Sequence, residues 1–295
     1  MKIGLLDIDG HNFPNLALMK ISAYHKNNGD IVEWVNFYDN YDIVYKSKIF
    51  TFTPNDIHFI NTPKIIEGGT GYDYSIKLPE YIDHIQPDYT LYKHALWNDH
   101  KTAYGFLTRG CNNNCSWCIV PKKEGKIQPY MDIEEIIQEK KQVVLMDNNI
   151  LQSDYGLTQI KKIIKLKIKI DFNQALDARL IDRPIAKLLS QVKWLKPVRM
   201  SCDTYQMLPY IKKATRYLRE YNCTPTIYFI FVLTKDISSA LKIVTLLRKW
   251  NLDPFSQPYI DFSGKNNISQ EQKNFARWVN HKAIFKSISW KDYIR

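Results

Sequence analysis

Residues 110–118 read Gly-Cys-Asn-Asn-Asn-Cys-Ser-Trp-Cys, and this stretch decides how the rest of the chain is interpreted. It contains Cys111, Cys115 and Cys118, three of the five cysteines in a chain of 295 residues. Their spacing is C-x3-C-x2-C, and no fourth cysteine lies nearby in the sequence. The apolar run 103–107 before the stretch is typical of a buried strand. A strand that leads into a short cysteine-rich loop predicts a metal site or a catalytic site at the end of that strand.

The number of cysteines limits the kind of metal. Three thiolates from one loop can hold three corners of a cubane iron–sulfur cluster and leave the fourth iron open. Structural zinc, in contrast, takes four ligands. A zinc site would need His94, His100 or a remote cysteine as its fourth ligand. We therefore favour the cluster and keep zinc as the alternative.

Composition and the first residues predict a cytoplasmic protein with no membrane partner. The longest apolar stretch, 227–233, is far shorter than the roughly 20 residues that a membrane helix needs. Residues 1–7 reach an acid too early for a signal peptide. Because cytoplasmic cysteines stay reduced, the close cysteine group indicates metal binding or catalysis rather than disulfides.

The charge is distributed unevenly. The chain carries a net charge of +11, but residues 1–100 hold 8 Lys and Arg against 13 Asp and Glu, and residues 101–295 hold 33 against 17. This asymmetry suggests two modules, of which the second has a net charge of +16. The second module would then suit an anionic substrate or nucleic acid. The plainer interpretation is a lysine-rich composition with solvated side chains, and we favour it.

Residues 1–100 alternate short apolar runs with turn signals. This order predicts a small Rossmann-like sheet whose ligands would bind at the loops 9–14 and 68–71 and at Ser47. Residues 79–100 are expected to form a connector. The expected elements are strands at 2–8, 30–35, 42–50 and 65–66, and a helix over 16–26 that Asn15 caps.

Residues 101–295 repeat a strand followed by a helix. This alternation predicts parallel strands joined by right-handed crossovers. Polar residues follow the strands at their carboxyl ends, the edge that carries the active site in barrel-like α/β folds. The expected strands are 103–107, 143–146, 167–172, 198–201, 226–233 and 254–261, and the expected helices are 133–141, 158–165, 184–192, 210–221, 239–250 and a closing packing helix at 269–282.

The cysteine loop, with Trp117 directly before its third cysteine, resembles the signature of the radical S-adenosylmethionine (radical SAM) enzymes. The resemblance spans residues 101–262. It implies an α/β fold in which a partial (β/α)6 barrel at 101–295 follows the small Rossmann-like domain at 1–100. It also implies a 4Fe-4S cluster on Cys111, Cys115 and Cys118, with S-adenosylmethionine bound to the open iron through its amino and carboxylate groups. The implied reaction is reductive cleavage of S-adenosylmethionine to a 5′-deoxyadenosyl radical, which abstracts hydrogen from a substrate.

The resemblance also implies cofactor contacts. Trp117 matches the position that lies against the adenine. Asp147, Asn148 and Asn149 stand where the family has a glycine-rich, acid-ended segment that receives the amino group, but they lack the glycines. The positions that usually supply ribose and carboxylate ligands are occupied here by Gln174, Asp177, Arg179, Ser201 and Asp203.

Residues 1–100 resemble the cobalamin-binding-like domain found ahead of many radical SAM barrels. That domain's motif is D-x-H-x-x-G, followed by a serine loop and Gly-Gly. Pro14 replaces the glycine of the motif, and the domain is short for a corrin with its nucleotide tail. We therefore expect a degenerate module rather than bound cobalamin. The residues that match the motif are Asp9, His11, Ser47, Gly68 and Gly69.

Two groups near the cysteine loop have open roles. Cys202 follows a predicted strand near the expected cavity and could donate a hydrogen atom to a product radical. Free cysteines are more often buried apolar residues, which is the interpretation we favour. Lys122, Lys123 and Glu124 follow the loop and are expected to form an exposed charged turn.

Two functional hypotheses follow. The first is a radical SAM enzyme that acts on an unidentified substrate and takes electrons from a flavodoxin-type or ferredoxin-type donor, as the resemblance implies. The second is a non-catalytic, basic, zinc-containing module that binds nucleic acid, which the charge of residues 101–295 motivates.

Overall fold

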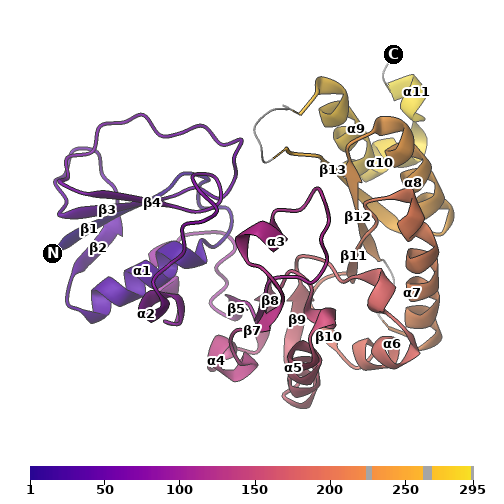
Figure 1. Cartoon of the computed structure of the whole chain (residues 1–295), viewed down its shortest axis with the longest axis horizontal. Coiled ribbons are helices and arrows are strands. Elements are labelled where there is room, and N and C mark those ends of the chain that lie inside the picture. Colours follow the sequence, from indigo (N-terminus) through magenta and orange to yellow (C-terminus); the bar gives the residue numbers. More distant parts are fainter. Residues whose placement is uncertain (224–227, 262–267, 294–295) are drawn as a thin grey trace. The chain divides into compact units, whose positions relative to one another are not determined.

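The structure is a computed structural model that describes residues 1–223, 228–261 and 268–293. The chain divides into two compact units, Met1–Tyr104 and Gly105–Arg295 (Figure 1). Both units are mixed α/β with parallel strands. Among the described residues, none of the helices combines the length and the apolar character needed to cross a membrane.

The first unit is built around a parallel sheet with the strand order β2-β1-β3-β4. Helix α1 (Leu16–Asn27) connects β1 to β2 and contacts both strands. The strands and the helix predicted for residues 1–70 are thereby confirmed, with shifted ends. The elements of this unit are β1 (Lys2–Asp7), β2 (Ile31–Trp34), β3 (Ile43–Ser47), β4 (Ile65–Gly68), the short helix α2 (Glu80–Asp83) and the 3-10 turn η1 (Tyr89–Tyr92).

Two positions of the cobalamin-like motif have partners inside the first unit. Ser47 is buried, and its Oγ accepts a hydrogen bond from Asn15 Nδ2 at 2.8 Å. Asn15 also caps α1, because its Oδ1 accepts a hydrogen bond from the backbone N of Leu18 at 3.3 Å. The ring of His11 lies 4.2 Å from the ring of Trp34, measured between centroids. The expectation of a degenerate module without cobalamin stays a prediction.

The two larger sheets formed by the second unit have the strand orders β10-β9-β8-β5 and β11-β12-β13, and strand β5 begins in the last residues of the first unit. An isolated parallel bridge between Leu176 and Met200 joins them. The pairs within β8–β9–β10 and β11–β12–β13 are parallel, as the strand–helix alternation predicted. A continuous (β/α)6 barrel stays a prediction. The strands are β5 (Thr102–Gly105), β8 (Gln142–Leu145), β9 (Lys169–Phe172), β10 (Lys193–Trp194), β11 (Arg199–Ser201), β12 (Phe229–Thr234) and β13 (Asp253–Pro258).

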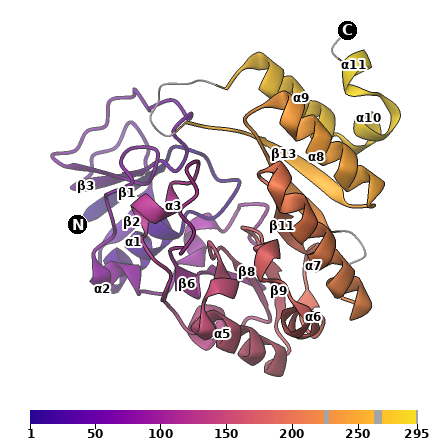
Figure 2. The ribbon, with the colours of Figure 1, turned by 45° about the vertical axis from the view of Figure 1, so that its right-hand side comes forward.

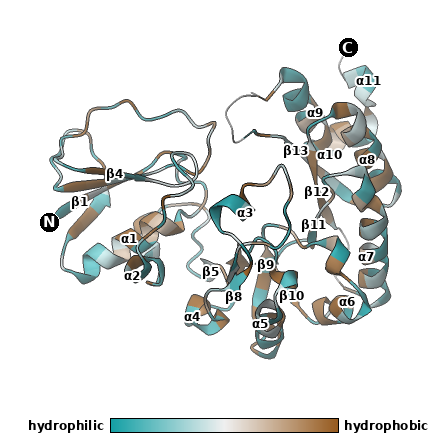
Figure 3. Cartoon of the chain, in the orientation of Figure 1, coloured by the Kyte–Doolittle hydropathy of each residue, from teal (hydrophilic) through white to brown (hydrophobic). Residues whose placement is uncertain are grey.

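Helices follow the strands of the second unit and pack on them. Helix α8 contacts β12 and β13, and helix α9 contacts β13 (Figure 2). Helix α7 buries Leu208, Ile211, Ala214 and Leu218 at helical spacing, and its remaining surface is mostly hydrophilic (Figure 3). The helices are α3 (Val120–Lys123), α4 (Ile133–Ile137), α5 (Asp154–Lys165), α6 (Arg183–Leu189), α7 (Leu208–Glu220), α8 (Ile237–Lys249), α9 (Gln270–Asn280), α10 (Lys282–Ser287) and α11 (Trp290–Tyr293).

Some element boundaries differ from those predicted. The helix predicted over 133–141 ends at Ile137, because Gln138 takes a φ of 49°, outside the helical range. Helix α5 begins earlier than predicted, because Ser153 caps it by accepting a hydrogen bond from Gly156 N at 3.2 Å. The first two residues of the strand predicted over 226–233 lie outside the described residues, and most of the others form β12.

The predicted packing helix at the end of the chain is confirmed. Helix α9 begins after a capping box between Ser269 and Gln272, which satisfies backbone groups at its first turn. It buries Phe275, Trp278 and Val279 and packs on β13. Its apolar face therefore closes the edge of the β11–β13 sheet.

A buried ion pair connects the two sheets of the second unit. The carboxylate of Asp171 on β9 pairs with the guanidinium of Arg199 on β11, and Asp171 is only 4% exposed. Next to this pair, the backbone N of Leu176 donates to Arg199 O at 2.8 Å. Because a buried charge that loses its partner stays uncompensated, this pair should be required for the junction.

Replacing Arg199 by methionine should destabilise the second unit by about 3 kcal/mol, because Asp171 would stay buried without a counter-charge. Arg183→Met is the matched control, since Arg183 pairs with Glu220 at 3.1 Å on the surface. Loss of an exposed pair costs about 0–1 kcal/mol. Urea unfolding followed by circular dichroism compares the two variants. Equal midpoints would show that the Asp171–Arg199 pair does not stabilise the junction.

Candidate metal centre

The three cysteines lie in a loop that a small hairpin closes. Strand β6 (Thr108–Arg109) pairs with β7 (Gln128–Pro129) in antiparallel fashion, and the loop 110–127 runs between them. This hairpin was not predicted, because each of its strands is too short to show an alternating pattern. It brings the two ends of the loop together.

The start of the loop has a conformation that requires glycine. Gly110 has a φ of +84°, and a Cβ at this position would lie 2.3 Å from the carbonyl oxygen of Lys126. The backbone N of Cys111 donates to the carbonyl oxygen of Gly125 at 3.1 Å. The first cysteine is therefore fixed where the chain enters the loop.

Glu124, near the end of the loop, binds the residues with which the loop begins. Its carboxylate accepts hydrogen bonds from Arg109 Nη2 at 2.7 Å and Nε at 3.0 Å, and from the backbone N of Gly110 at 3.1 Å. Burial raises the pKa of Glu124, but the charge of Arg109 and the hydrogen bonds from Arg109 and Gly110 together outweigh burial and hold the pKa below its ordinary value. The expectation of an exposed charged turn is therefore wrong for Glu124, whose side chain is 9% exposed, because Arg109 supplies its counter-charge inside the loop.

Asp147 holds the chain segment that leads into the loop. It follows β8, and its carboxylate accepts hydrogen bonds from Leu107 N at 3.1 Å and from Thr108 Oγ1 at 2.7 Å. Burial raises the pKa of Asp147 to about 6 in spite of these hydrogen bonds. These contacts give Asp147 a structural role. Its predicted contact with a cofactor stays a prediction.

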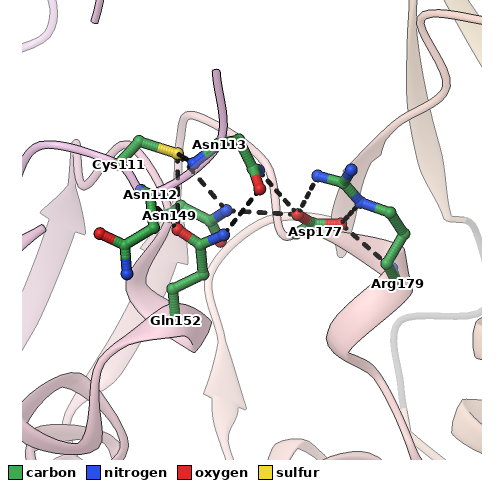
Figure 4. A network of polar contacts seen from close by, with 7 residues as sticks. All are labelled: Cys111, Asn112, Asn113, Asn149, Gln152, Asp177 and Arg179. Atoms are coloured by element: carbon green, nitrogen blue, oxygen red, sulfur yellow. Dashed lines mark hydrogen bonds and ion pairs between the residues drawn. The ribbon is translucent and has the colours of Figure 1, made fainter. Parts of the chain in front are cut away.

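Residues from three segments meet around Cys111 (Figure 4). Its Sγ lies 3.4 Å from the backbone N of Asn113, 3.7 Å from Asn149 Nδ2 and 3.5 Å from Gln152 Oε1. Asp177, which follows β9, accepts hydrogen bonds from Asn113 Nδ2 at 3.1 Å and Asn149 Nδ2 at 3.3 Å. The cysteine loop is thereby linked to the carboxyl ends of β8 and β9.

Arg179 adds a positive charge to this network. Its Nη2 and Nε donate to the two carboxylate oxygens of Asp177 at 2.6 Å and 2.8 Å. Burial raises the pKa of Asp177, but the hydrogen bonds from Arg179 and Asn113 outweigh burial, so that the pKa lies below its ordinary value. The hydrogen bond to Asp177 raises the pKa of Arg179, and the charges of Cys115 and Cys111 add to this effect. The guanidinium thus lies within electrostatic range of two thiols.

Trp117 and Asp203 also meet in the site. The Asp203 carboxyl accepts a hydrogen bond from the Trp117 side chain, and burial raises the pKa of Asp203 to about 6 against this hydrogen bond. Burial raises the pKa of Cys115 and of Cys118, and the neighbouring thiols and Asp203 raise both further. Binding of a metal by these thiols would therefore release protons.

Other predicted residues lie outside these contacts. Gln174 is exposed in the turn after β9, and Ser201 is half-buried at the end of β11. Cys202 is fully buried, and its Sγ lies 3.7 Å from the carbonyl oxygen of Thr204. Burial raises the pKa of its thiol to about 12. These observations favour the interpretation of Cys202 as a buried apolar residue.

Sequence reasoning missed Asn113 and Gln152. Asn113 stands between two cysteines in a run of three asparagines, which looked like a plain polar loop. Gln152 follows the buried residues Ile150 and Leu151 and precedes the capping residue Ser153. The signal that could have found Gln152 is its place after a predicted strand, in the same turn as Asn149.

The chemistry of the site suits an iron–sulfur cluster. Three thiols share one loop, and N–H donors and a guanidinium that lie near them can compensate thiolate charge. Asn149 Oδ1 is buried and has no hydrogen-bond partner among the described residues, which leaves an acceptor for a further ligand. Within the described ranges, no group of three or more His, Cys, Asp and Glu side chains, the three cysteines included, is arranged to hold a metal ion.

Comparison with known proteins gives limited matches. No family model matches the chain, and no curated protein matches it. Three crystal structures of SuiB from Streptococcus suis are similar to it. The one bound to S-adenosylmethionine has 14% identity and a TM-score of 0.46, covering 63% of this chain and 48% of the SuiB chain. The one bound to precursor peptide SuiA has 13% identity and a TM-score of 0.43, covering 62% and 45%. This chain thus spans about half the length of the SuiB chains.

Asp203 should titrate near pH 6 in the folded protein. An unfolded aspartate titrates at about 3.9, so the folded state binds more protons between these values, and the contribution of Asp203 to stability falls as the pH rises through this range. The hydrogen bond from Trp117 gives a local readout. Subtracting the tryptophan fluorescence of Trp117→Phe from that of the wild type gives the signal of Trp117. This signal should change with pH with a midpoint near pH 6, and the Asp203→Asn variant should lack this change. A transition that persists in Asp203→Asn would contradict the assignment.

Proposed function

We propose that this chain is a radical SAM enzyme that binds a 4Fe-4S cluster through Cys111, Cys115 and Cys118. The observation that carries the proposal is the C-x3-C-x2-C loop whose first cysteine is hydrogen-bonded to Asn149 and, through Asn113, to Asp177. These two partners follow β8 and β9, two parallel strands. The carboxyl ends of parallel strands are where α/β folds bind their ligands.

When bound, the cluster supplies the electron that breaks the sulfonium C–S bond of S-adenosylmethionine and so yields a 5′-deoxyadenosyl radical. The residues of this chain hold and orient the reactants. Glu124 and Asp147 keep the cysteine loop in place. Arg179, 39% exposed, offers its guanidinium to the carboxylate of S-adenosylmethionine. Trp117 and Asp203, which are hydrogen-bonded to each other, would contact the adenosine.

Asn149 is the best placed of the three residues predicted to receive the amino group. The side chains of Asp147 and Asn148 already form hydrogen bonds, with Thr108 and Glu124 respectively. Asn149 Oδ1, in contrast, is a buried acceptor without a partner among the described residues, and Asn149 Nδ2 contacts Cys111. An ammonium group bound beside Cys111 would satisfy this acceptor.

The proposal implies two partners. One is an electron donor of the flavodoxin or ferredoxin type, because the cluster must be reduced before each cleavage. The other is a substrate, and the net charge of +16 over residues 101–295 favours an anionic one.

Protein that is reconstituted with iron and sulfide without oxygen, and then reduced, should cleave S-adenosylmethionine to 5′-deoxyadenosine. Replacing Cys111, Cys115 or Cys118 by alanine should lower the product to background, since each variant loses one cluster ligand. Cys202→Ala is the matched control, because this thiol is fully buried and its hydrogen bond runs to Thr204, and it should keep the activity. A protein that binds one zinc ion and no cluster would contradict the proposal and favour the zinc-containing nucleic-acid-binding module.

Asn149→Ala should weaken the binding of S-adenosylmethionine by about tenfold, the loss of roughly one hydrogen bond to a charged group. Asn149→Asp should not restore the binding, because its second carboxylate oxygen replaces the N–H donor to Asp177 and Cys111 by a like charge. Asn114→Ala, at an exposed position of the same loop, is the control. Anaerobic equilibrium dialysis measures the three dissociation constants. Equal values for Asn149→Ala and Asn114→Ala would rule out this role of Asn149.

A further inference from the structure

The sulfur of Cys111 has three polar contacts. Two N–H groups approach its sulfur, the backbone N–H of Asn113 at 3.4 Å and Asn149 Nδ2 at 3.7 Å. A third contact runs from the thiol to Gln152 Oε1 at 3.5 Å. The sulfur is therefore surrounded on several sides by amide groups (Figure 4).

Gln152 is the side chain that connects these contacts. It ends the 3-10 turn η2 (Ile150–Gln152), which follows β8 and precedes α5. Its Oε1 accepts a hydrogen bond from the backbone N of Asn112 at 2.9 Å, and its Nε2 donates to Asn113 Oδ1 at 2.8 Å. One side chain thus binds two consecutive loop residues directly after Cys111.

The hydrogen bonds of the Asn113 side chain determine where its backbone N–H points. Asn113 is held on one side by Gln152 and on the other by Asp177, which accepts from its Nδ2 at 3.1 Å. With both ends of the Asn113 side chain fixed, its backbone N–H stays directed at the sulfur of Cys111. The turn η2, rather than the loop itself, therefore sets the surroundings of this sulfur.

We propose that Gln152 is a positioning residue that holds Cys111 and the N–H donor of Asn113 in place and thereby raises the reduction potential of the cluster. The inference rests on the proposed function, because it concerns the cluster that Cys111 would ligate. N–H donors stabilise negative charge on a thiolate sulfur, and reduction adds negative charge to the cluster. The donors therefore favour the reduced state, and their loss lowers the potential.

The first test uses the protein without metal. In anaerobic Gln152→Ala and Gln152→Met, iodoacetamide should alkylate Cys111 about tenfold more slowly relative to Cys115 than in the wild type. The thiolate is the form that reacts, and losing about 1.4 kcal/mol of hydrogen bonding from its N–H donors leaves less of it. Methionine keeps the length of the side chain, so it separates lost hydrogen bonds from lost packing. Gln191→Ala, at an exposed position beyond α6, is the control and should leave the ratio unchanged.

The second test uses the reconstituted protein. The midpoint potential, followed by electron paramagnetic resonance, should fall in both Gln152 variants by about 59 mV for a tenfold shift in the one-electron equilibrium, and it should stay unchanged in Gln191→Ala. Unchanged alkylation ratios and potentials in the Gln152 variants would overturn the inference. A wild-type protein that takes up no cluster would contradict the proposed function, and the effect on the potential with it. The alkylation ratio would still show whether Gln152 positions Cys111.

Discussion

The candidate site depends on one buried carboxylate. Asp177 is 7% exposed, and a buried ion is costly unless it is both paired and hydrogen-bonded. Arg179 supplies the counter-charge, and Asn113 and Asn149 supply further donors. These donors come from the cysteine loop and from the end of β8. The hydrogen bonds that stabilise the Asp177 carboxylate therefore also fix the position of Cys111. A single electrostatic requirement therefore links the loop to the carboxyl ends of two strands.

Two further carboxylates hold the entrance of the same loop. Asp147 binds the backbone before β6, and Glu124 binds Arg109 and the backbone of Gly110. All of these contacts form between protein groups, and together they fix the segment in which the loop begins.

The features that the sequence could predict are local. The spacing of Cys111, Cys115 and Cys118 and the apolar run before them lie within one short stretch, and the alternation of strands and helices repeats along residues 101–295. Parallel pairing and the gathering of polar strand ends follow from these patterns. The sequence also predicted that Asn149, Asp177 and Arg179 belong to one site, and the structure brings them together.

The features that could not be predicted depend on partners far away in the chain. The structural role of Asp147 is one of them, because its carboxylate accepts a hydrogen bond from Thr108, 39 residues earlier. Glu124 looked exposed because two lysines precede it, whereas Arg109, 15 residues earlier, allows it to be buried. Gln152 has no motif of its own, and its importance appears only when Asn113, 39 residues earlier, lies beside it. In each case the tertiary partner, not the local pattern, decides the role.

With three cysteine ligands, a bound 4Fe-4S cluster would keep one iron open for S-adenosylmethionine. Mössbauer spectroscopy of protein reconstituted with iron-57, recorded before and after the cofactor is added, observes that iron. The signal of a single iron per cluster should change, because the remaining irons keep their thiolates. A cluster in which no iron responds to S-adenosylmethionine, or a protein that assembles no cluster, would contradict this expectation.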